Sequence, residues 1–364
     1  MNFDLTEEQQ LLADTAREVL SRSRDSLDSP GWSREVWQQL AEIGILGLGF
    51  EPEESGPIEV AAVMTEVGRH LAPEPVAAAA LIPGAVIAAY GSEAQRAGLE
   101  AVAAGQRLLA FAHTEPDTRG AAQRAGQLTT RATREAGGWS VTGIKNPVLA
   151  GDSADTLVVS AALPGGGAGL FLVDAGATRR TAYRTFDNRG GAEVRLEGTP
   201  AEQLGPDGDA TAQIEAAVIR FQSALCAEAV GAMEEALRLT TEYLKARKQF
   251  GAPLKTFQTL TQRAADMYVS LEVARSMNLY AAVCIADGRF DPVVAARAKL
   301  QIGRSGRHIA QEAIQLHGGI GVTAEYPVAH YAARLTAIEQ TFGSATDQVR
   351  LLSEQVGDYG VVVL

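Results

Sequence analysis

Along the first hundred residues, apolar positions recur with the spacing of amphipathic helices. Leu12, Ala16 and Val19 follow one another at i, i+4 and i+7, which places them on one face of a helix. Thr6 precedes two glutamates, an arrangement typical of a helix N-cap with acidic residues in the first turn. The same spacing predicts further helices over residues 33–43, 61–70 and 76–90. We therefore expect residues 1–107 to form an α-helical N-terminal domain.

Between residues 108 and 205 the helical spacing is replaced by short runs of β-forming residues. The runs are LLAFAH, LTTRAT, WSVTGI, DTLVVSA, GLFLVD and AEVRLEG, and the glycine-rich stretch LPGGGAG is the clearest turn between two of them. Several short strands at this spacing favour a compact sandwich or barrel.

From residue 209 to about residue 356 the helical spacing returns in long stretches. One apolar stripe repeats every three or four residues from Ile214 to Leu237, and a second helix is predicted from Pro292 to the paired glycines at 318 and 319. Long helices with one apolar face pack in bundles or across subunit contacts. We assign residues 206–364 to a C-terminal helical bundle domain.

Composition narrows the functional classes. The 364-residue chain carries a formal net charge of −12, which argues against general nucleic-acid binding. Its two cysteines, Cys226 and Cys284, lack metal-like spacing and suit a reducing compartment. The N-terminus is acidic and polar, unlike a signal peptide, and the most apolar run, residues 75–90, is shorter than the ~20 residues that cross a bilayer. We expect a soluble, cytoplasmic protein without membrane insertion.

The segment RKQFGAPLKTFQ, residues 247–258, follows the first long helix of the C-terminal domain. In the structural interpretation, this segment is the end of a helix. Its cations lie at the negative end of the helix dipole, and Gly251 ends the helix. Read functionally, Arg247 and Gln249 face a phosphate-bearing cofactor and Phe250 packs beside it. Arginine suits this role because its planar fork binds two phosphate oxygens at once.

The segment QLHGGIGVTAEYP, residues 315–327, allows the same two interpretations. Paired glycines end a helix, and they also let a backbone approach an anionic ligand closely. His317 is interpreted as structural, because no nucleophile or metal ligand lies near it in the sequence.

Together with HTEPDTRG at residues 113–120, these segments resemble the acyl-CoA dehydrogenase family over nearly the whole chain. The resemblance implies an α-helical N-terminal domain, a middle β-barrel domain and a C-terminal four-helix bundle that bind FAD and desaturate an acyl-CoA thioester between Cα and Cβ. It also implies that the two C-terminal turns hold the pyrophosphate and adenosine end of a neighbouring subunit's FAD. We call the implied contacts the FAD-tail set: Arg247, Gln249, Phe250, Gln258, Gln315, Gly318 and Gly319.

The chain departs from the family where the chemistry takes place. The family's catalytic glutamate position corresponds to Gly343, and the alternative position on the first C-terminal helix corresponds to Phe221 or Gln222. None of these residues can accept a proton. Pro147 and Leu149 replace an aromatic residue and a threonine beside the flavin ring. We call these departures the ring-side set: Pro147, Leu149, Phe221, Gln222 and Gly343.

This asymmetry resembles the non-catalytic subunit of the actinobacterial α2β2 acyl-CoA dehydrogenases that act on steroid side chains. The resemblance implies a homologous catalytic partner subunit, an acyl-CoA substrate and electron-transfer flavoprotein as the electron acceptor. One alternative is a self-sufficient homotetramer with a displaced base, Glu339 or Asp347. Another is a flavin-free acyl-CoA-binding or scaffold protein on the same fold.

Overall fold

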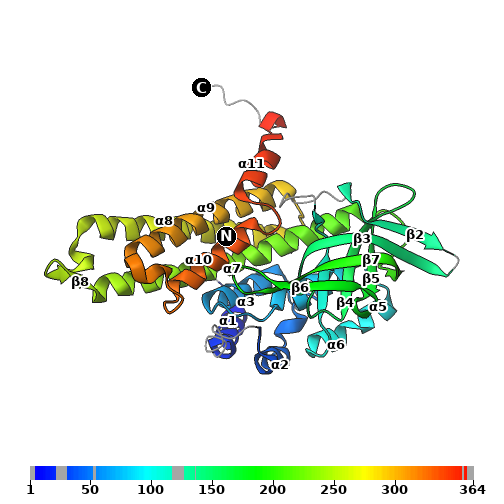
Figure 1. The fold of residues 1–364 in the computed structure, drawn as a ribbon, viewed down its shortest axis with the longest axis horizontal. Coiled ribbons are helices and arrows are strands. Elements are labelled where there is room, and N and C mark those ends of the chain that lie inside the picture. The colour runs from blue at the N-terminus through cyan, green and yellow to red at the C-terminus, as the bar shows by residue number, and fades with distance from the viewer. Residues whose placement is uncertain are drawn as a thin grey trace.

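A computed structural model describes residues 5–21, 31–51, 55–116, 127–135, 137–354 and 356–358. Its elements form three groups, with short helices first, a β-sheet next and long helices last (Figure 1). The long helices lie along the longest axis of the molecule, and the sheet occupies one end of that axis (Figure 1).

The first group confirms the predicted helical start of the chain. Its helices are α1 (Glu7–Leu20), α2 (Arg34–Glu42), α3 (Pro57–Arg69), η3 (Ala77–Leu81), α4 (Ile82–Tyr90), α5 (Glu93–Ala97) and α6 (Leu99–Ala103), with a short turn, η2 (Ile45–Gly47). Thr6 caps α1 in a reciprocal capping box with Gln9. Helix α3 starts four residues before the predicted position, because proline occupies its first turn and the Glu59 carboxylate accepts the Gly56 N–H at 2.8 Å. The short helices α5 and α6 were not predicted.

The middle group is a seven-stranded sheet that closes on itself. Its strands are β1 (Leu109–Ala112), β2 (Arg131–Glu135), β3 (Gly138–Leu149), β4 (Thr156–Ala162), β5 (Ala168–Asp174), β6 (Arg179–Arg184) and β7 (Gly190–Gln203), with the turn η6 (Ala175–Ala177). Strands β4, β5, β7, β3 and β2 form a ring that returns to β4 through the pair Arg131 and Ala162, while β1 and β6 extend it. The predicted barrel is therefore present. Strand β6 escaped prediction because most of its residues are exposed and polar, so it has no apolar alternation.

The last group is a bundle of long helices. Its elements are α7 (Thr211–Ala246), β8 (Lys248–Gln249), β9 (Ala252–Pro253), η7 (Leu254–Thr256), α8 (Gln258–Ala286), α9 (Pro292–His317), η8 (Gly318–Val322), α10 (Val328–Gln340), α11 (Ala345–Glu354) and η9 (Val356–Asp358). As predicted, α9 has proline in its first turn and ends at Gly318, whose φ is +68°.

Two bundle helices, α7 and α8, are long and apolar enough to cross a membrane by length and composition alone. The apolar window of α7 is 89% buried within the molecule, as expected for a core helix. That of α8 is only 39% buried, and its exposed apolar side chains are Tyr268, Val269, Val273 and Tyr280. Helix α8 therefore presents an apolar stripe that is available for contact with another chain.

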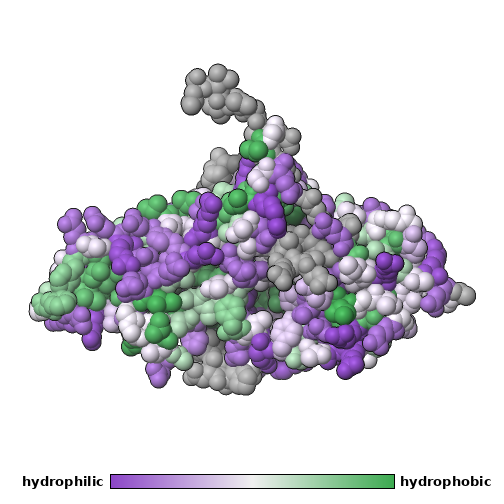
Figure 2. All heavy atoms as spheres, turned by 45° about the horizontal axis from the view of Figure 1, so that its top comes forward, coloured by the Kyte–Doolittle hydropathy of each residue, from purple (hydrophilic) through white to green (hydrophobic). Residues whose placement is uncertain are grey.

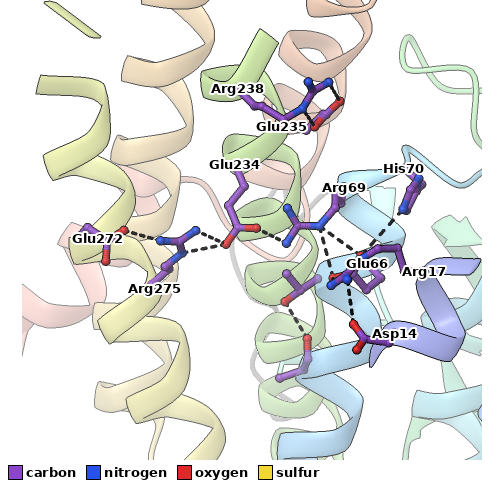
Figure 3. Close-up of polar contacts among 12 residues, drawn as sticks. Asp14, Arg17, Glu66, Arg69, His70, Glu234, Glu235, Arg238, Glu272 and Arg275 are labelled. Carbon is purple, nitrogen blue, oxygen red and sulfur yellow. Dashed lines mark hydrogen bonds and ion pairs between the residues drawn. The ribbon is translucent and has the colours of Figure 1, made fainter. Parts of the chain in front are cut away.

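Helices α3 and α7 cross at unusually short range. A Cβ added to Gly68 would lie 1.8 Å from the Glu228 carbonyl oxygen, and one added to Gly231 would lie 1.8 Å from that of Thr65. Charged side chains then connect α1, α3, α7 and α8 in alternating order, as Figure 3 shows. The series runs Asp14, Arg17, Glu66, Arg69, Glu234, Arg275 and Glu272. The first helical group is thus fixed onto the bundle.

Candidate functional site

The first C-terminal motif forms a small hairpin at the end of the bundle farthest from the barrel (Figure 1). Helix α7 stops at Ala246 because Arg247 turns to an extended backbone, and the Leu254 N–H then donates to the Arg247 carbonyl at 2.8 Å. Phe250 occupies the tight turn with φ of +53° and is 91% exposed. Its ring is therefore available for contact with another molecule.

The second motif lies beside the first. The rings of Tyr243 on α7 and His317 on α9 are 4.5 Å apart, and Tyr326 lies 4.8 Å from His317. His317 is buried, its Nδ1 lies 2.7 Å from the Ala313 carbonyl oxygen, and burial lowers its pKa. These contacts support the structural interpretation of His317, which holds the ends of α7 and α9 together.

The chemistry of this end suits a phosphate-bearing ligand. Within the described part of the chain, the Arg247 guanidinium makes no hydrogen bond or ion pair, and Gln249, Gln258 and Gln315 are exposed. A Cβ added to Gly318 or Gly319 would meet nothing within 4 Å, so the backbone there is open to a ligand. Figure 2 shows apolar side chains gathered at the same end, and the exposed ones include Phe250, Ile320 and Val322.

The loop between α10 and α11 contains Gly343 and is fixed by hydrogen bonds. The Phe342 ring packs on Phe221 with 4.8 Å between centroids, and the Gln222 side-chain amide donates to the Phe342 carbonyl at 2.8 Å. The buried Lys299 ammonium donates to the carbonyls of Ile338, Glu339 and Gly343 at 2.8, 2.9 and 3.2 Å. The structure thus brings three ring-side positions together around Phe342: its ring packs on Phe221, its carbonyl accepts from Gln222, and Gly343 follows it in the chain.

The two candidate displaced bases both help to begin α11. Glu339 is buried, accepts the Ala345 N–H at 2.9 Å and pairs with Arg307 at 3.6 Å. Asp347 accepts the N–H and hydroxyl of Ser344 at 2.9 and 2.7 Å. Because these oxygens stabilise a helix N-terminus, neither carboxylate is poised for proton abstraction.

Leu149 and Phe221 line a cleft, and one wall of this cleft is a buried ion cluster. Arg334 pairs with Glu228 at 2.7 Å and with Asp187 at 2.8 Å, while Arg189 pairs with Glu228 at 3.0 Å. Burial would raise the pKa of Glu228, but the charges of Arg334 and Arg189 outweigh it and lower the pKa. Glu228 therefore stays ionised and paired, which makes it unsuitable as a base.

The sequence interpretation missed this cluster. The sequence does contain one sign of the ion cluster. Glu228 is a charged residue seven positions after Phe221, and it therefore lies on the same helical face. Its partners come from distant segments, the loop before β7 and helix α10, so their proximity is a product of the fold.

The glutamate of the TEP segment is part of the barrel's interior. Glu115 pairs with Lys145 at 2.8 Å and accepts the backbone N–H groups of Thr129 and Thr130 at 2.7 and 3.0 Å. Lys145 also donates to the His113 carbonyl at 3.0 Å. This buried pair holds the end of β1 against β3, and both groups are occupied by structural contacts.

The FAD-tail and ring-side sets lie far apart within one chain. Phe221 lies on α7, and Arg247 directly follows the last residue of this helix, 26 positions later in the sequence. At 1.5 Å per residue the separation along the helix is about 39 Å, or roughly seven turns. One dinucleotide does not extend over this distance, so the two sets of one chain cannot both contact the same dinucleotide.

Comparison with known proteins identifies the family of this chain. The acyl-CoA dehydrogenase N-terminal domain matches residues 6–106, and the acyl-CoA dehydrogenase C-terminal domain matches residues 215–357. The acyl-CoA dehydrogenase IpdE2 of Mycobacterium tuberculosis is 30% identical, over 96% of this chain and 98% of that protein. The chain belongs to the acyl-CoA dehydrogenase family.

Solved structures agree on the fold. A variant of the Tcur3481-Tcur3483 steroid ACAD has a TM-score of 0.88 at 29% identity, covering 97% of this chain and 98% of that one. The ChsE4-ChsE5 complex of Mycobacterium tuberculosis has a TM-score of 0.88 at 26% identity, covering 99% and 100%. The predicted acyl-CoA dehydrogenase fold is confirmed, with helical first and last groups around a closed sheet.

Members of this family bind FAD, and the two ends of this chain differ in how well they suit it. At the FAD-tail set, the unpaired Arg247 guanidinium and the open glycine backbone fit a pyrophosphate. At the ring-side set, Pro147 and Leu149 offer no side-chain donor, and the cleft lined by Leu149 holds paired charges. The ring-side residues do not fit a flavin ring.

Proposed function

We propose that this chain is a subunit of an FAD-dependent acyl-CoA dehydrogenase, and that it supplies the pyrophosphate and adenosine half-site to a homologous catalytic partner. The observation that carries the proposal is the contrast between its two ends. Arg247 is exposed and unpaired among the described residues, whereas Gly343 lies in a loop held by Lys299 and Gln222. Such a chain is equipped to complete a neighbour's cofactor site and lacks the base for its own.

The proposed assembly is an α2β2 heterotetramer in the cytoplasm, with electron-transfer flavoprotein as the electron acceptor. The similarity to a two-component complex and to a steroid ACAD supports a heteromer acting on a bulky acyl-CoA such as a steroid side chain. The exposed apolar stripe of α8 offers a contact surface for another subunit.

The two alternatives are less well supported. A self-sufficient homotetramer needs Glu339 or Asp347 as its base, yet both carboxylates accept hydrogen bonds at the start of α11. A flavin-free scaffold gives no reason for an unpaired arginine beside an open pair of glycines.

Turnover of the purified single chain tests the proposal. Because general acid–base help is worth roughly 10² to 10⁴ in rate, we expect no dye-linked acyl-CoA oxidation by this chain alone. Co-expression with a homologous dehydrogenase that has an intact catalytic glutamate should give a yellow, active complex. Turnover by the single chain at the rate of the complex would contradict the proposal, and a complex that never contains flavin would favour the scaffold.

A further inference from the structure

A second cleft lies between the N-terminal helices and α7. Its walls are mainly apolar and include Leu48, Val60, Leu81, Ile82, Ala85 and Ala224. On α7 it is bordered by Arg220 and Ser223, whereas the cleft with the ion cluster is bordered by Phe221, Leu225 and Glu228. At 100° per residue these groups face different sides of the helix. The second cleft is therefore separate from the ring-side set.

Arg220 is the only cation lining this cleft among the described residues. Its guanidinium carbon lies 4.5 Å from the centre of the Phe290 ring, and it makes no hydrogen bond or ion pair with any residue that the structure describes. Burial lowers the pKa of its guanidinium. The buried Arg189 and Arg334 differ in this respect, because each pairs with a carboxylate.

Arg220 is half-buried. A charge that is partly removed from water is less stable than one in water, and an anion or a hydrogen-bonding partner lowers that cost. Stacking on Phe290 orients the guanidinium plane but does not neutralise it. The cleft thus combines one unmet positive charge with a wall of hydrocarbon. A ligand that satisfies both has one anionic group and an apolar body.

We propose that this cleft binds a free carboxylic acid with an apolar chain. The carboxylate pairs with the Arg220 guanidinium, whose planar fork matches two carboxylate oxygens, and Ser223 lies beside it as a further hydrogen-bond donor. The chain lies along Leu81, Ile82 and Ala85. A nucleotide or a coenzyme A headgroup does not fit, because one arginine and one serine leave several phosphate groups without partners.

Calorimetric titration of the full-length chain with three probes tests the site. The probes are decanoate, decan-1-ol with the same tail but no charge, and acetate with the same charge but no tail. We expect decanoate to bind at one site per chain, and the other two at least tenfold more weakly. Equal affinity for decanoate and decan-1-ol would overturn the role of Arg220, and equal affinity for decanoate and acetate would overturn the role of the cleft.

Substitutions then locate the site. Arg220→Met should weaken decanoate binding about tenfold to a hundredfold, since a hydrogen bond to a charged group is lost, and should leave decan-1-ol binding unchanged. Arg304→Met is the matched control, because Arg304 is an exposed helical arginine without a partner in the described residues; it should bind decanoate as the unmodified chain does.

The melting temperature of ligand-free Arg220→Met gives a second, independent result. Removing a half-buried charge that has no partner among the described residues should leave the melting temperature unchanged or raise it. A clear decrease would mean that a carboxylate of the protein itself pairs with Arg220, and that outcome would overturn the proposal. Decanoate binding by Arg220→Met at the original affinity would overturn it as well.

Discussion

Arg247 is the residue on which the proposed half-site depends most directly. We expect Arg247→Ala to release FAD from the assembled complex, because a charge-assisted contact to phosphate is worth roughly 1.5–3 kcal/mol, about ten- to a hundredfold in affinity. The melting temperature of the flavin-free chain should not change, since the side chain is exposed and makes no hydrogen bond or ion pair with the described residues. Flavin absorbance after gel filtration measures the loss, with Arg304→Ala as the control. Full flavin retention in Arg247→Ala would remove this residue from the site.

Glu115 and Lys145 form a buried ion pair. We expect the effect on the free energy of unfolding to depend on whether one charge or both charges are removed. Lys145→Met removes the charge that pairs with the buried Glu115 carboxylate, so it should cost about 3–5 kcal/mol of the free energy of unfolding. The double variant Glu115→Gln, Lys145→Met removes both charges and should recover most of that loss. Urea unfolding of the two variants and the parent chain gives the comparison. A double variant less stable than Lys145→Met would show that the pair acts through something other than its charges.

The same pair predicts a dependence of stability on pH. Burial alone would raise the pKa of Glu115, but the charge of Lys145 and the hydrogen bonds from Lys145, Thr129 and Thr130 lower it well below its ordinary value of 4.5. Since the unfolded state then binds protons more readily, the contribution of Glu115 is present above pH 4.5 and lost as the pH falls below it. Melting temperatures from pH 6 to pH 3 should therefore decline less steeply in the double variant than in the parent chain.

At the scale of the elements, the crossing of α3 and α7 depends on two glycines. Gly231→Ala would place a methyl group against the Thr65 carbonyl, so the helices must separate, at a typical cost of 1–3 kcal/mol for overpacking. Gly306→Ala on α9 is the control, because its added methyl group would lie at an ordinary 3.4 Å from Leu335 and alanine favours a helix. Thermal unfolding should show a lower melting temperature for the first variant only. Equal melting temperatures would mean that the crossing adjusts without strain.

The helices and strands themselves followed from the sequence wherever the apolar period was strong. Six of the seven barrel strands and the long helices α7 and α9 were predicted from this signal, and β6 was missed because its exposed polar residues carry none. Contacts between distant segments could not be predicted from the apolar period. Gly231 could not be matched with Thr65, nor Glu228 with Arg334, because the period of one helix does not identify the element packed against it.

The candidate site shows the same division. The FAD-tail set was predicted from turn motifs, whose local geometry the sequence encodes, and the structure brings its two segments together at one end of the bundle. Its contact with FAD stays a prediction. The ring-side set was predicted only from residues that lack the expected functional group, such as a glycine in place of a carboxylate. That Gln222 and Lys299 hold the altered loop required the structure, because the three segments are more than 40 residues apart.

At the scale of the whole molecule, the separation of the two sets predicts the flavin content of the complex. In a homotetramer of this family each chain would offer one ring-side and one tail-side half-site, giving one FAD per chain. Here only the tail side suits the cofactor, so the assembled α2β2 protein should contain about one FAD for every two chains. Flavin absorbance against total protein measures this ratio. One FAD per chain would contradict the half-site assignment.

The same reasoning predicts that restoring the base alone does not restore activity. Gly343→Glu returns a carboxylate, but the ring-side set still lacks groups for a flavin, so no bound acceptor takes the hydride. Gly343 also has φ of +98°, a conformation that strains any residue with a Cβ, and its carbonyl accepts from Lys299. The purified Gly343→Glu homomer should therefore be colourless and inactive in a dye-linked assay. The control is the same variant assembled with its partner, which should keep the flavin content and turnover of the parent complex, because the partner's site does not use Gly343. An active Gly343→Glu homomer would show that this chain binds its own flavin, and that result would contradict the half-site model.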